Sequence, residues 1–135
     1  MSIHEILVAM KSDQNKSHAV MAQRFESVDS LDNFPTPPWA TRALLERVIK
    51  SEIQGLQSCL EPACGAGHMA SVQKDYFAHV HASDIYDYGY GNVVDFQNHS
   101  YGSATYDWVI TNPPFKLAEI FINEGLKIAD RKSVV

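Results

Sequence analysis

A glycine-rich turn, Glu61-Pro62-Ala63-Cys64-Gly65-Ala66-Gly67, is the first segment whose residue types could do chemistry. Gly65 and Gly67 let the backbone bend sharply and let a ligand approach without a Cβ in the way. The helix expected after the turn begins with unpaired N–H groups. Asp84, 17 residues after Gly67, can accept hydrogen bonds from both hydroxyls of a ribose. This combination is typical of a site for a nucleoside cofactor.

Three interpretations of the turn stay open. Gly65, Gly67 and Ala70 match the Gly-x-Gly-x-x-Gly/Ala pattern of dinucleotide sites, and a plain tight turn can have the same short sequence. A dinucleotide places its pyrophosphate at the helix N-terminus, where Glu61 would repel it. S-adenosylmethionine has no phosphate, and its amine suits a carboxylate. Glu61 therefore favours S-adenosylmethionine.

The second segment is Thr111-Asn112-Pro113-Pro114-Phe115, directly after an expected strand. The two prolines remove two backbone donors and fix two φ angles, so the carbonyls of Asn112 and Pro113 can face outward beside the Asn112 side-chain oxygen. Such acceptors can hold an exocyclic amino group and aim its lone pair at a methyl donor, while Phe115 stacks on the ring. A strand-ending proline turn with a buried phenylalanine is the alternative.

The elements that position these segments alternate along the chain. We expect strands at 58–62, 78–84, 93–96 and 106–111, helices at 37–53, 67–76 and 116–129, and the start of another strand at 133–135. Alternating strands and helices predict an α/β fold with a parallel sheet of the Rossmann type.

Local signals add detail to two of these helices. Thr36 is expected to cap the first helix with Pro37 at its first position, and Glu46 and Lys50 to pair on its wet side. Gly55 is expected to end it. In the last helix the side chains expected to face the core are Leu117, Ile120, Phe121 and Ile128.

In this order, the segments Leu60–Gly67 and Asn112–Phe115 resemble those of the S-adenosylmethionine-dependent N6-adenine DNA methyltransferases. Phe34-Pro35-Thr36-Pro37-Pro38 is similar to the Phe/Tyr-x-Thr-Pro segment that precedes them and helps to cover the cofactor. The order resembles the gamma arrangement of that family, and the phage-type enzymes in particular. The resemblance covers residues 33–135. It implies a Rossmann-like class I methyltransferase fold that moves a methyl group from S-adenosylmethionine to adenine N6 in DNA.

The resemblance also implies a role for each matching residue. The target adenine, flipped out of a duplex, would be held by Asn112, Pro113, Pro114 and Phe115. The residues expected to bind the cofactor are Thr36 and Pro37 beside it, Glu61, Ala63, Gly65 and Gly67 at its methionine part, Asp84 at its ribose, and Ile85, Asp95 and Phe96 at its adenine.

The chain departs from the family after the helix 116–129. The family has further strands and target-recognition parts there, and here only Ser133-Val134-Val135 follows. We therefore expect a truncated sheet, with strand 106–111 as an exposed edge open to self-association, and little activity of this chain alone. The alternatives are an RNA or protein-glutamine methyltransferase and a non-catalytic remnant that binds cofactor or a partner chain. A dinucleotide-dependent oxidoreductase is disfavoured by Glu61 and by the Asn-Pro-Pro-Phe segment.

The composition is that of one small domain. The chain has 135 residues, 45% of them hydrophobic, and a formal net charge of -5, which excludes a collagen-like, coiled-coil or fully disordered chain. We expect residues 1–32 to be a partly disordered lead-in and 33–135 a partial methyltransferase domain. Segment 33–115 contains no cluster of cations for a nucleic-acid backbone.

Location and metal binding are judged from the same composition. Two cysteines are too few for a disulfide framework. No apolar run reaches the roughly 18 residues of a membrane helix, and no secretory signal is visible, so we expect a cytoplasmic protein. His79 and His81 share a strand face but lack further ligands, so no metal site is predicted. Cys64 is interpreted as a small turn residue, and four tyrosines as loop packing: Tyr86, Tyr88, Tyr90 and Tyr101.

Overall fold

A parallel sheet of five strands runs through the computed structural model, which describes residues 34–102 and 105–134. The strands are β1 (Ser58–Glu61), β2 (His79–Asp84), β3 (Asn92–Val93), β4 (Tyr106–Ile110) and β5 (Ala129–Val134), in the spatial order β3-β2-β1-β4-β5. All four pairings are parallel. The expected α/β fold of the Rossmann type is confirmed, whereas the predicted lead-in 1–32 lies outside the described residues.

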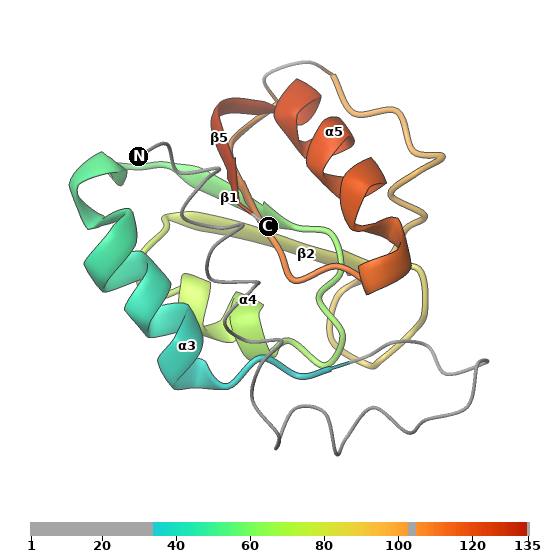
Figure 1. Ribbon diagram of the computed structural model, residues 1–135, viewed down its shortest axis with the longest axis horizontal. Helices are drawn as coiled ribbons and strands as arrows, with labels where there is room; N and C mark the ends of the chain where they lie inside the picture. The colour runs from blue at the N-terminus through green and yellow to red at the C-terminus, as the bar shows by residue number, and fades with distance from the viewer. Residues whose placement is uncertain (1–33, 103–104, 135) are drawn as a thin grey trace.

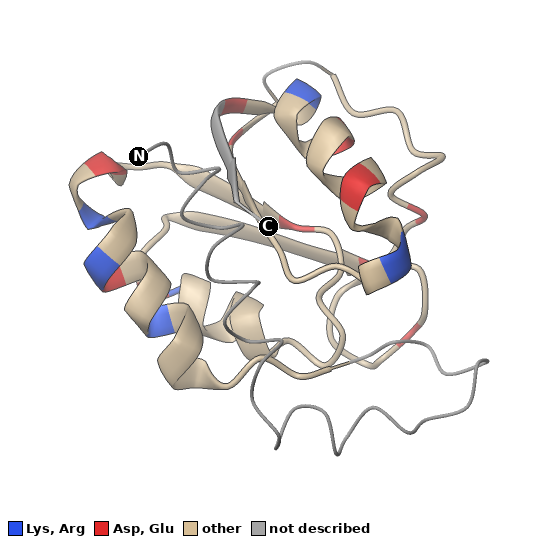
Figure 2. Ribbon diagram, viewed as in Figure 1, with Lys and Arg blue, Asp and Glu red and all other residues tan. Residues whose placement is uncertain are grey.

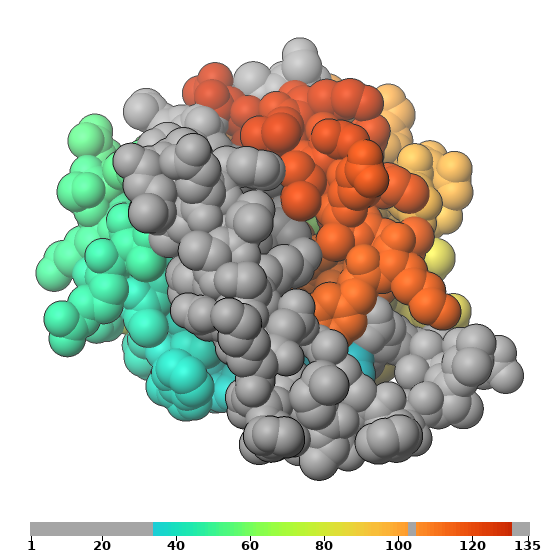
Figure 3. All heavy atoms as spheres, in the orientation of Figure 1, coloured from blue at the N-terminus to red at the C-terminus, as the bar shows by residue number. Residues whose placement is uncertain are grey.

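Helices cover both faces of this sheet (Figure 1). On one face lie α3 (Pro38–Ala43), which continues as the π-helical η1 (Leu44–Val48) and the 3₁₀ turn η2 (Lys50–Glu52), and the short α4 (His68–Gln73). On the other lies α5 (Ala118–Ile128), preceded by the 3₁₀ turn η3 (Phe115–Leu117). The space-filling view shows the atoms of α3 and η1 along one flank of the molecule and those of α5 along the opposite flank (Figure 3).

Two hydrophobic clusters fill the space between the sheet and its helices. The first contains Leu44, Leu45, Ile49, Cys59, Met69, Val72, Phe77, Trp108 and Ile110, and the second contains Leu60, Phe96, Val109, Phe121 and Ile128. Neighbouring strand residues therefore belong to opposite clusters, because successive side chains of a strand point to opposite faces. The inner strands β1 and β4 are buried on both sides, as expected for parallel strands, whereas His79 and His81 of β2 are exposed.

The first helix begins later than predicted. Pro37 is its N-cap, with an extended ψ of 141°, and Pro38 occupies the first helical position. Pro38 disfavours a helical conformation for the residue before it, so the prediction that Thr36 caps the helix with Pro37 first is wrong. The hydroxyl of Thr36 instead accepts a hydrogen bond from Asn112.

The ion pair predicted within this helix is also absent from the described structure. The carboxylate of Glu46 accepts a hydrogen bond from the hydroxyl of Tyr76, beyond the end of α4, rather than pairing with Lys50. The tertiary partner replaces the local one because Tyr76, in the turn after α4, lies within hydrogen-bond distance of Glu46 in η1. The helical segment ends at Glu52 with Ile53 extended, so Gly55, with φ of 61°, lies beyond its end and does not end it as predicted.

The exposed edge is not where we expected it. Strand β4 pairs with β1 on one side and with β5 on the other, so the prediction that 106–111 forms the edge is wrong. The backbone becomes extended at Ala129, directly after α5, and the strand therefore begins before the predicted Ser133. Ile120 was also assigned wrongly, since its side chain is 41% exposed while Phe121 is 6% exposed.

Candidate functional site

The candidate site lies at the carboxyl ends of β1, β2 and β4. Glu61 is the last residue of β1, Asp84 is the last residue of β2, and the tetrapeptide Asn112–Phe115 follows the end of β4. Strand β1 lies between the other two, and the chain leaves it toward β2 on one side of the sheet and reaches β4 on the other. Ligands of open α/β sheets bind outside the carboxyl ends of the strands at such a switch point.

The glycine-rich turn is fastened to the end of β2. The N–H of Gly65 donates to Asp84 Oδ2 at 2.9 Å, and the N–H of Cys64 donates to the carbonyl of Ser83 at 2.9 Å. Gly65 and Gly67 have φ values of 52° and 89°, which only glycine adopts freely. The turn and Asp84 are therefore joined directly by a hydrogen bond.

Glu61 is a buried carboxyl group beneath this turn. It is 1% exposed, and its Oε1 accepts hydrogen bonds from the N–H of Ala63 at 3.0 Å and from the hydroxyl of Thr111. Burial raises the pKa of Glu61 to about 7, and the two hydrogen bonds oppose that rise. A group that changes charge near neutral pH thus lies between the two sequence motifs.

Thr111 is a site residue that sequence reasoning missed. It is 3% exposed and ties the end of β4 to Glu61 at the end of β1. The buried Gln73 of α4 makes a second tie of this kind, since its Nε2 donates to the carbonyl of Ile110 at 3.1 Å. In the sequence, Thr111 and Gln73 each stand out only as a polar residue beside apolar ones. That signal does not identify the residue with which each side chain forms its hydrogen bond.

Asp84 ends β2 beside the glycine-rich turn, and Ile85 follows it. Asp84 Oδ1 accepts from the N–H of Tyr86 at 3.2 Å, so each of its oxygens already holds one backbone donor and has room for another. Ile85 is 49% exposed. The carboxylate of Asp84 can therefore receive ribose hydroxyls without releasing the turn.

Asp95 and Phe96 lie farther along the chain, after β3. The carboxylate of Asp95 accepts from the N–H of Gln97 at 3.0 Å and from Asn98 Nδ2 at 2.6 Å, and thus stabilises its own turn. Phe96 is 3% exposed, and its ring centroid lies 4.7 Å from that of Phe121. The side chain of Phe96 belongs to the core beneath α5, so only its backbone is available to a ligand.

The loop between β2 and β3 lies against the glycine-rich turn. A Cβ added to Gly67 would fall 2.4 Å from the ring of Tyr90, and one added to Gly91 would fall 2.5 Å from the carbonyl oxygen of Ala82. Lys74 Nζ lies 5.2 Å from the centroid of the Tyr90 ring. The interpretation of Tyr90 as a packing residue is confirmed, but its contact with the glycine-rich turn was not predicted.

Cys64 is the other turn residue for which an alternative role was weighed. Its thiol is buried and donates to the carbonyl of Gly65 at 3.5 Å. Burial, with Glu61 and Asp84 nearby, raises the pKa of Cys64 to about 11. A protonated thiol is a poor nucleophile, which agrees with a structural role.

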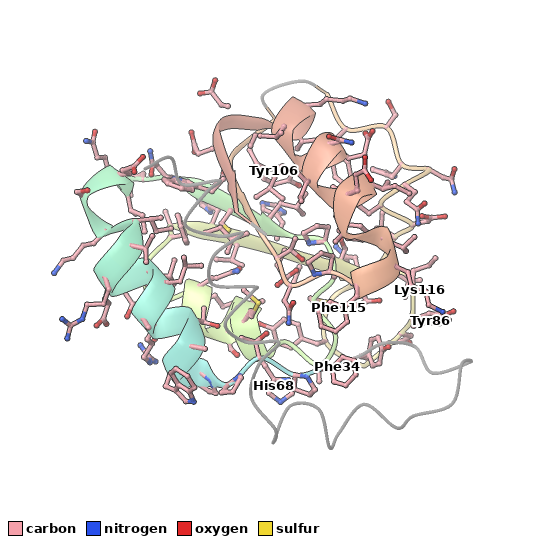
Figure 4. The ribbon with its side chains drawn as sticks, viewed as in Figure 1. Phe34, His68, Tyr86, Tyr106, Phe115 and Lys116 are labelled. Atoms are coloured by element: carbon pink, nitrogen blue, oxygen red, sulfur yellow. The ribbon has the colours of Figure 1, made fainter. Side chains whose placement is uncertain are left out.

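The tetrapeptide after β4 is exposed at Asn112 and Phe115 and contacts the segment before α3. Asn112 Nδ2 donates to Thr36 Oγ1 at 3.1 Å. The rings of Phe34 and Phe115 have centroids 5.8 Å apart and lie side by side at the carboxyl edge of the sheet (Figure 4). Phe115 is 42% exposed, so the alternative of a turn with a buried phenylalanine is wrong.

The remaining predicted residues take three kinds of position. Ala63 and Thr36 are half-buried, Pro37 is exposed, Pro113 is buried and Pro114 is half-buried. Four of the site segments are thus brought together, namely 34–37, 61–67, 84–85 and 112–115.

Within residues 34–102 and 105–130, no group of three His, Cys, Asp or Glu side chains could hold a metal ion.

Charged side chains are unevenly distributed around the fold. Figure 2 shows basic residues along α3, η1 and η2, where Arg42 pairs with Asp75 at 2.9 Å. Lys116 is exposed and directly follows Phe115 at the site.

None of the helices in the described part of the chain is long and apolar enough to cross a membrane.

Comparisons with known proteins identify the fold. No family model and no curated protein matches this chain. A protein from Pyrococcus horikoshii, provisionally assigned as an RNA methyltransferase, has a similar structure, with a TM-score of 0.61 and 19% identity over 83% of this chain and 66% of its own length. A provisional S-adenosyl-L-methionine-dependent methyltransferase from Methanococcus maripaludis follows, with a TM-score of 0.52 and 13% identity over 71% of this chain and 52% of its own.

The two neighbours are both longer than the segment they share with this chain. The chain spans about two thirds of the first and about half of the second. With its five parallel strands and helices on both faces, the chain has the Rossmann-like α/β fold of the class I methyltransferases.

Proposed function

We propose that this chain is an S-adenosylmethionine-dependent methyltransferase module that acts on the N6 amino group of adenine in DNA. The observation that carries the proposal is the exposed Asn112 amide and the exposed Phe115 ring, which meet Thr36 and Phe34 at the carboxyl edge that also carries Glu61 and Asp84. An amide oxygen next to an aromatic face is suited to a planar ring with an amino group.

The turn suits S-adenosylmethionine better than a dinucleotide. Glu61 places a carboxyl group beneath the turn, where an ammonium group is attracted and a pyrophosphate is repelled. The ring of Tyr90 lies against Gly67, the N-cap of α4, where a pyrophosphate would bind. Asp84 has acceptor capacity for ribose hydroxyls, and Ile85 offers an exposed apolar side chain for an adenine ring.

The remaining proposed cofactor contacts follow the family resemblance. Ala63, Gly65 and Gly67 would line the methionine part, Thr36 and Pro37 would flank the cofactor, and Asp95 with the backbone of Phe96 would face its adenine. When bound, S-adenosylmethionine supplies an electrophilic methyl group.

The chain contributes position and polarisation. Asn112 Oδ1 and the carbonyl of Pro113 would accept the two N–H groups of the target amine, which keeps the nitrogen lone pair free for an in-line attack. Pro114 fixes the backbone that carries these acceptors. Phe115 would stack on the target ring. The rate enhancement then comes from orientation, with no covalent bond to the enzyme.

A nucleic acid suits this surface better than a protein glutamine does. Phe34 and Phe115 present neighbouring aromatic rings, and every base has a face that can stack on them. The exposed ammonium of Lys116, adjacent in sequence to Phe115, suits a backbone phosphate. RNA is the second candidate substrate, favoured by the structural similarity to a protein provisionally assigned as an RNA methyltransferase.

We also propose that methyl transfer by this chain alone is slow. The chain spans about two thirds and about half of the two similar structures, and a nucleic-acid-binding surface needs more clustered cations than α3 and η1 provide. The alternative is a non-catalytic module that binds the cofactor. Strand β5, at the edge of the sheet, is the place where a second chain would pair.

Titration calorimetry tests the cofactor half of the proposal. We expect the chain to bind S-adenosylmethionine and not NAD, and the Asp84→Asn variant to bind it at least about tenfold more weakly, since one charge-assisted hydrogen bond contributes about 1.5–3 kcal/mol. Binding of NAD in preference to S-adenosylmethionine would exclude the proposed cofactor.

Methyl transfer from labelled S-adenosylmethionine to adenine-containing DNA and RNA oligonucleotides tests the chemical half. Asn112→Ala is expected to abolish transfer while leaving cofactor binding nearly intact, and the exposed Asn123 of α5 provides the control variant Asn123→Ala. Unchanged transfer by Asn112→Ala would remove Asn112 from the catalytic machinery. Cofactor binding without transfer to either nucleic acid would favour the non-catalytic module.

A further inference from the structure

We infer that Thr36 is a positioning residue that orients the side-chain amide of Asn112, so that the amide presents its oxygen to the amino group to be methylated. The structural basis is the hydrogen bond from Asn112 Nδ2 to Thr36 Oγ1, 3.1 Å long, between residues 76 positions apart. The inference rests on the proposed function and adds to it a step that the motif alone does not provide.

The need for such a residue follows from the chemistry of an amide. An asparagine side chain ends in an oxygen that only accepts and a nitrogen that only donates, and the two ends have nearly the same shape. A target amino group also donates, so it is bound by the oxygen and repelled by the nitrogen. An exposed Asn112 that rotated freely would present the wrong end for part of the time. Holding Nδ2 on Thr36 leaves Oδ1 for the target.

The segment before α3 is built to hold this contact. Phe34 and Thr36 are two residues apart and both half-buried, whereas Pro35 and Pro37 are exposed, so the side chains of Phe34 and Thr36 lie on the same side of the chain. Both meet the tetrapeptide, Phe34 at Phe115 and Thr36 at Asn112. Pro35 and Pro37 fix the backbone on either side of Thr36. The position of the hydroxyl is therefore set by stiff chain and by a second contact.

Thr36 has no competing local role in the structure. Its side chain makes no cap hydrogen bond with α3, which begins one residue later than the sequence predicts. A role as a cofactor contact, which the family resemblance implies, predicts a different experimental result. A pure cofactor contact affects the affinity for S-adenosylmethionine, whereas an orienting contact affects the transfer step and the Asn112 amide.

The test compares three variants of the whole chain. Thr36→Val removes the hydroxyl and keeps the shape, and Thr36→Ser keeps the hydroxyl. Thr41→Val is the matched control, because Thr41 is buried and its hydroxyl has no partner in the described structure. The readouts are the side-chain amide resonances of Asn112 in ¹H–¹⁵N spectra, calorimetric affinity for S-adenosylmethionine, and methyl transfer to an adenine-containing oligonucleotide.

We expect Thr36→Val to shift the Asn112 amide resonances and to lower kcat by about two- to tenfold, the effect of losing one neutral positioning hydrogen bond. The affinity for S-adenosylmethionine, which Thr36 would flank, should fall less than kcat does. Thr36→Ser should restore both the resonances and kcat, and Thr41→Val should change neither. If the Thr36 hydroxyl donated instead, it would bond to Asn112 Oδ1 and the Nδ2 protons would not change in Thr36→Val. A change in the chemical shift of the Nδ2 protons therefore identifies the bond in which Nδ2 donates.

Three outcomes would overturn the inference. Asn112 resonances that are identical in the wild type and Thr36→Val would mean that the hydrogen bond does not form. An affinity for S-adenosylmethionine that falls as much as kcat would make Thr36 a cofactor contact. Loss of kcat in Thr36→Ser equal to that in Thr36→Val would show that the hydroxyl is not what matters.

Failure of the proposed function gives a separate pattern. If the wild type transfers no methyl group, 2′-deoxyadenosine is titrated while the Asn112 resonances are followed. The orienting role would be supported without catalysis if 2′-deoxyadenosine shifts the Asn112 resonances in the wild type and in Thr36→Ser but not in Thr36→Val. No shift in the wild type would overturn both the orienting role and the proposed substrate.

Discussion

The turn after β1 and the tetrapeptide after β4 lie at the same edge of the sheet, but they are held in opposite ways. The turn is buried and fastened from three sides: Glu61 bonds to Thr111, Gly65 to Asp84, and Gly67 packs against Tyr90. The tetrapeptide is exposed at Asn112 and Phe115, and its side-chain contacts reach the segment before α3.

This difference separates stability from chemistry. Changes in the turn disturb buried hydrogen bonds and close packing, so they are expected to affect the folding free energy together with cofactor binding. Changes in the tetrapeptide leave the core intact and are expected to affect the reaction alone. The following predictions test this separation, beginning with the largest expected change in stability.

The first prediction concerns the pH dependence set by Glu61. Burial raises its pKa in the folded chain to about 7, from an ordinary value of 4.5. Between these pH values the folded state holds a proton that the unfolded state has lost, so the free energy of unfolding falls as pH rises through 7. Relative to Glu61→Gln, the wild type should lose about 2–3 kcal/mol of stability between pH 5 and pH 8.

Urea unfolding of the two proteins at both pH values measures this loss. Glu119→Gln, at the exposed start of α5, is the control and should follow the wild type. An ammonium ligand has the opposite dependence, since it stabilises ionised Glu61. Affinity for S-adenosylmethionine should therefore rise from pH 6 to pH 8 in the wild type and stay constant in Glu61→Gln. Equal pH dependence of stability in all three proteins would place the charge change elsewhere.

The second prediction concerns the packing of Gly67. An alanine there must adopt a left-handed backbone with φ near 89° and must displace the ring of Tyr90. The backbone strain costs about 1–2 kcal/mol, and displacement of the ring adds to it. We expect Gly67→Ala to lower the free energy of unfolding by about 2 kcal/mol or more, and to weaken binding of S-adenosylmethionine.

Gly89→Ala separates the two causes. Gly89 has φ of 78°, and an added Cβ would meet nothing within 4 Å, so it should pay only for backbone strain, about 1 kcal/mol. In a Tyr90→Ala background, the cost of Gly67→Ala should fall to that of Gly89→Ala. Equal costs for the two glycine variants in the wild-type background would mean that Tyr90 does not hold the turn.

Much of the fold could be predicted from the sequence because the inner strands carry strong local signals. Strands β1, β2 and β4 were predicted from short segments that end in turns, and each lies within a residue or two of its expected bounds. Strand β5 did not, because its first residues, Ala129-Asp130-Arg131-Lys132, are mostly polar. Their extended state depends on pairing with β4, which is a tertiary effect rather than a propensity.

The candidate site likewise has a part that the sequence predicted and a part that it did not. The glycines, Asp84 and the Asn-Pro-Pro-Phe segment were found from short spacings and from the resemblance that they carry. The contacts that hold them were missed, as in the pairing of Thr36 with Asn112, because the two residues are 76 positions apart. Local rules gave Thr36 a capping role, and a distant partner displaced it.

The smallest predicted effect is the coupling between Phe34 and Phe115. Their centroids are 5.8 Å apart with planes inclined at 39°, and Phe115 is 42% exposed. A double-mutant cycle of Phe34→Ala and Phe115→Ala, followed by urea unfolding, should give a coupling energy of about 0.5–1 kcal/mol. Methyl transfer should fall in Phe115→Ala although the protein stays folded.

The core pair Phe96 and Phe121 provides the standard for this cycle. Their centroids are 4.7 Å apart and both are buried, so Phe121→Ala should cost about 3–5 kcal/mol. A cost of that size for Phe115→Ala would make the tetrapeptide part of the core, and the separation of stability from chemistry would fail. A small cost with a large loss of transfer would mean that the exposed ring at the end of β4 is retained for a ligand, because the fold does not need it.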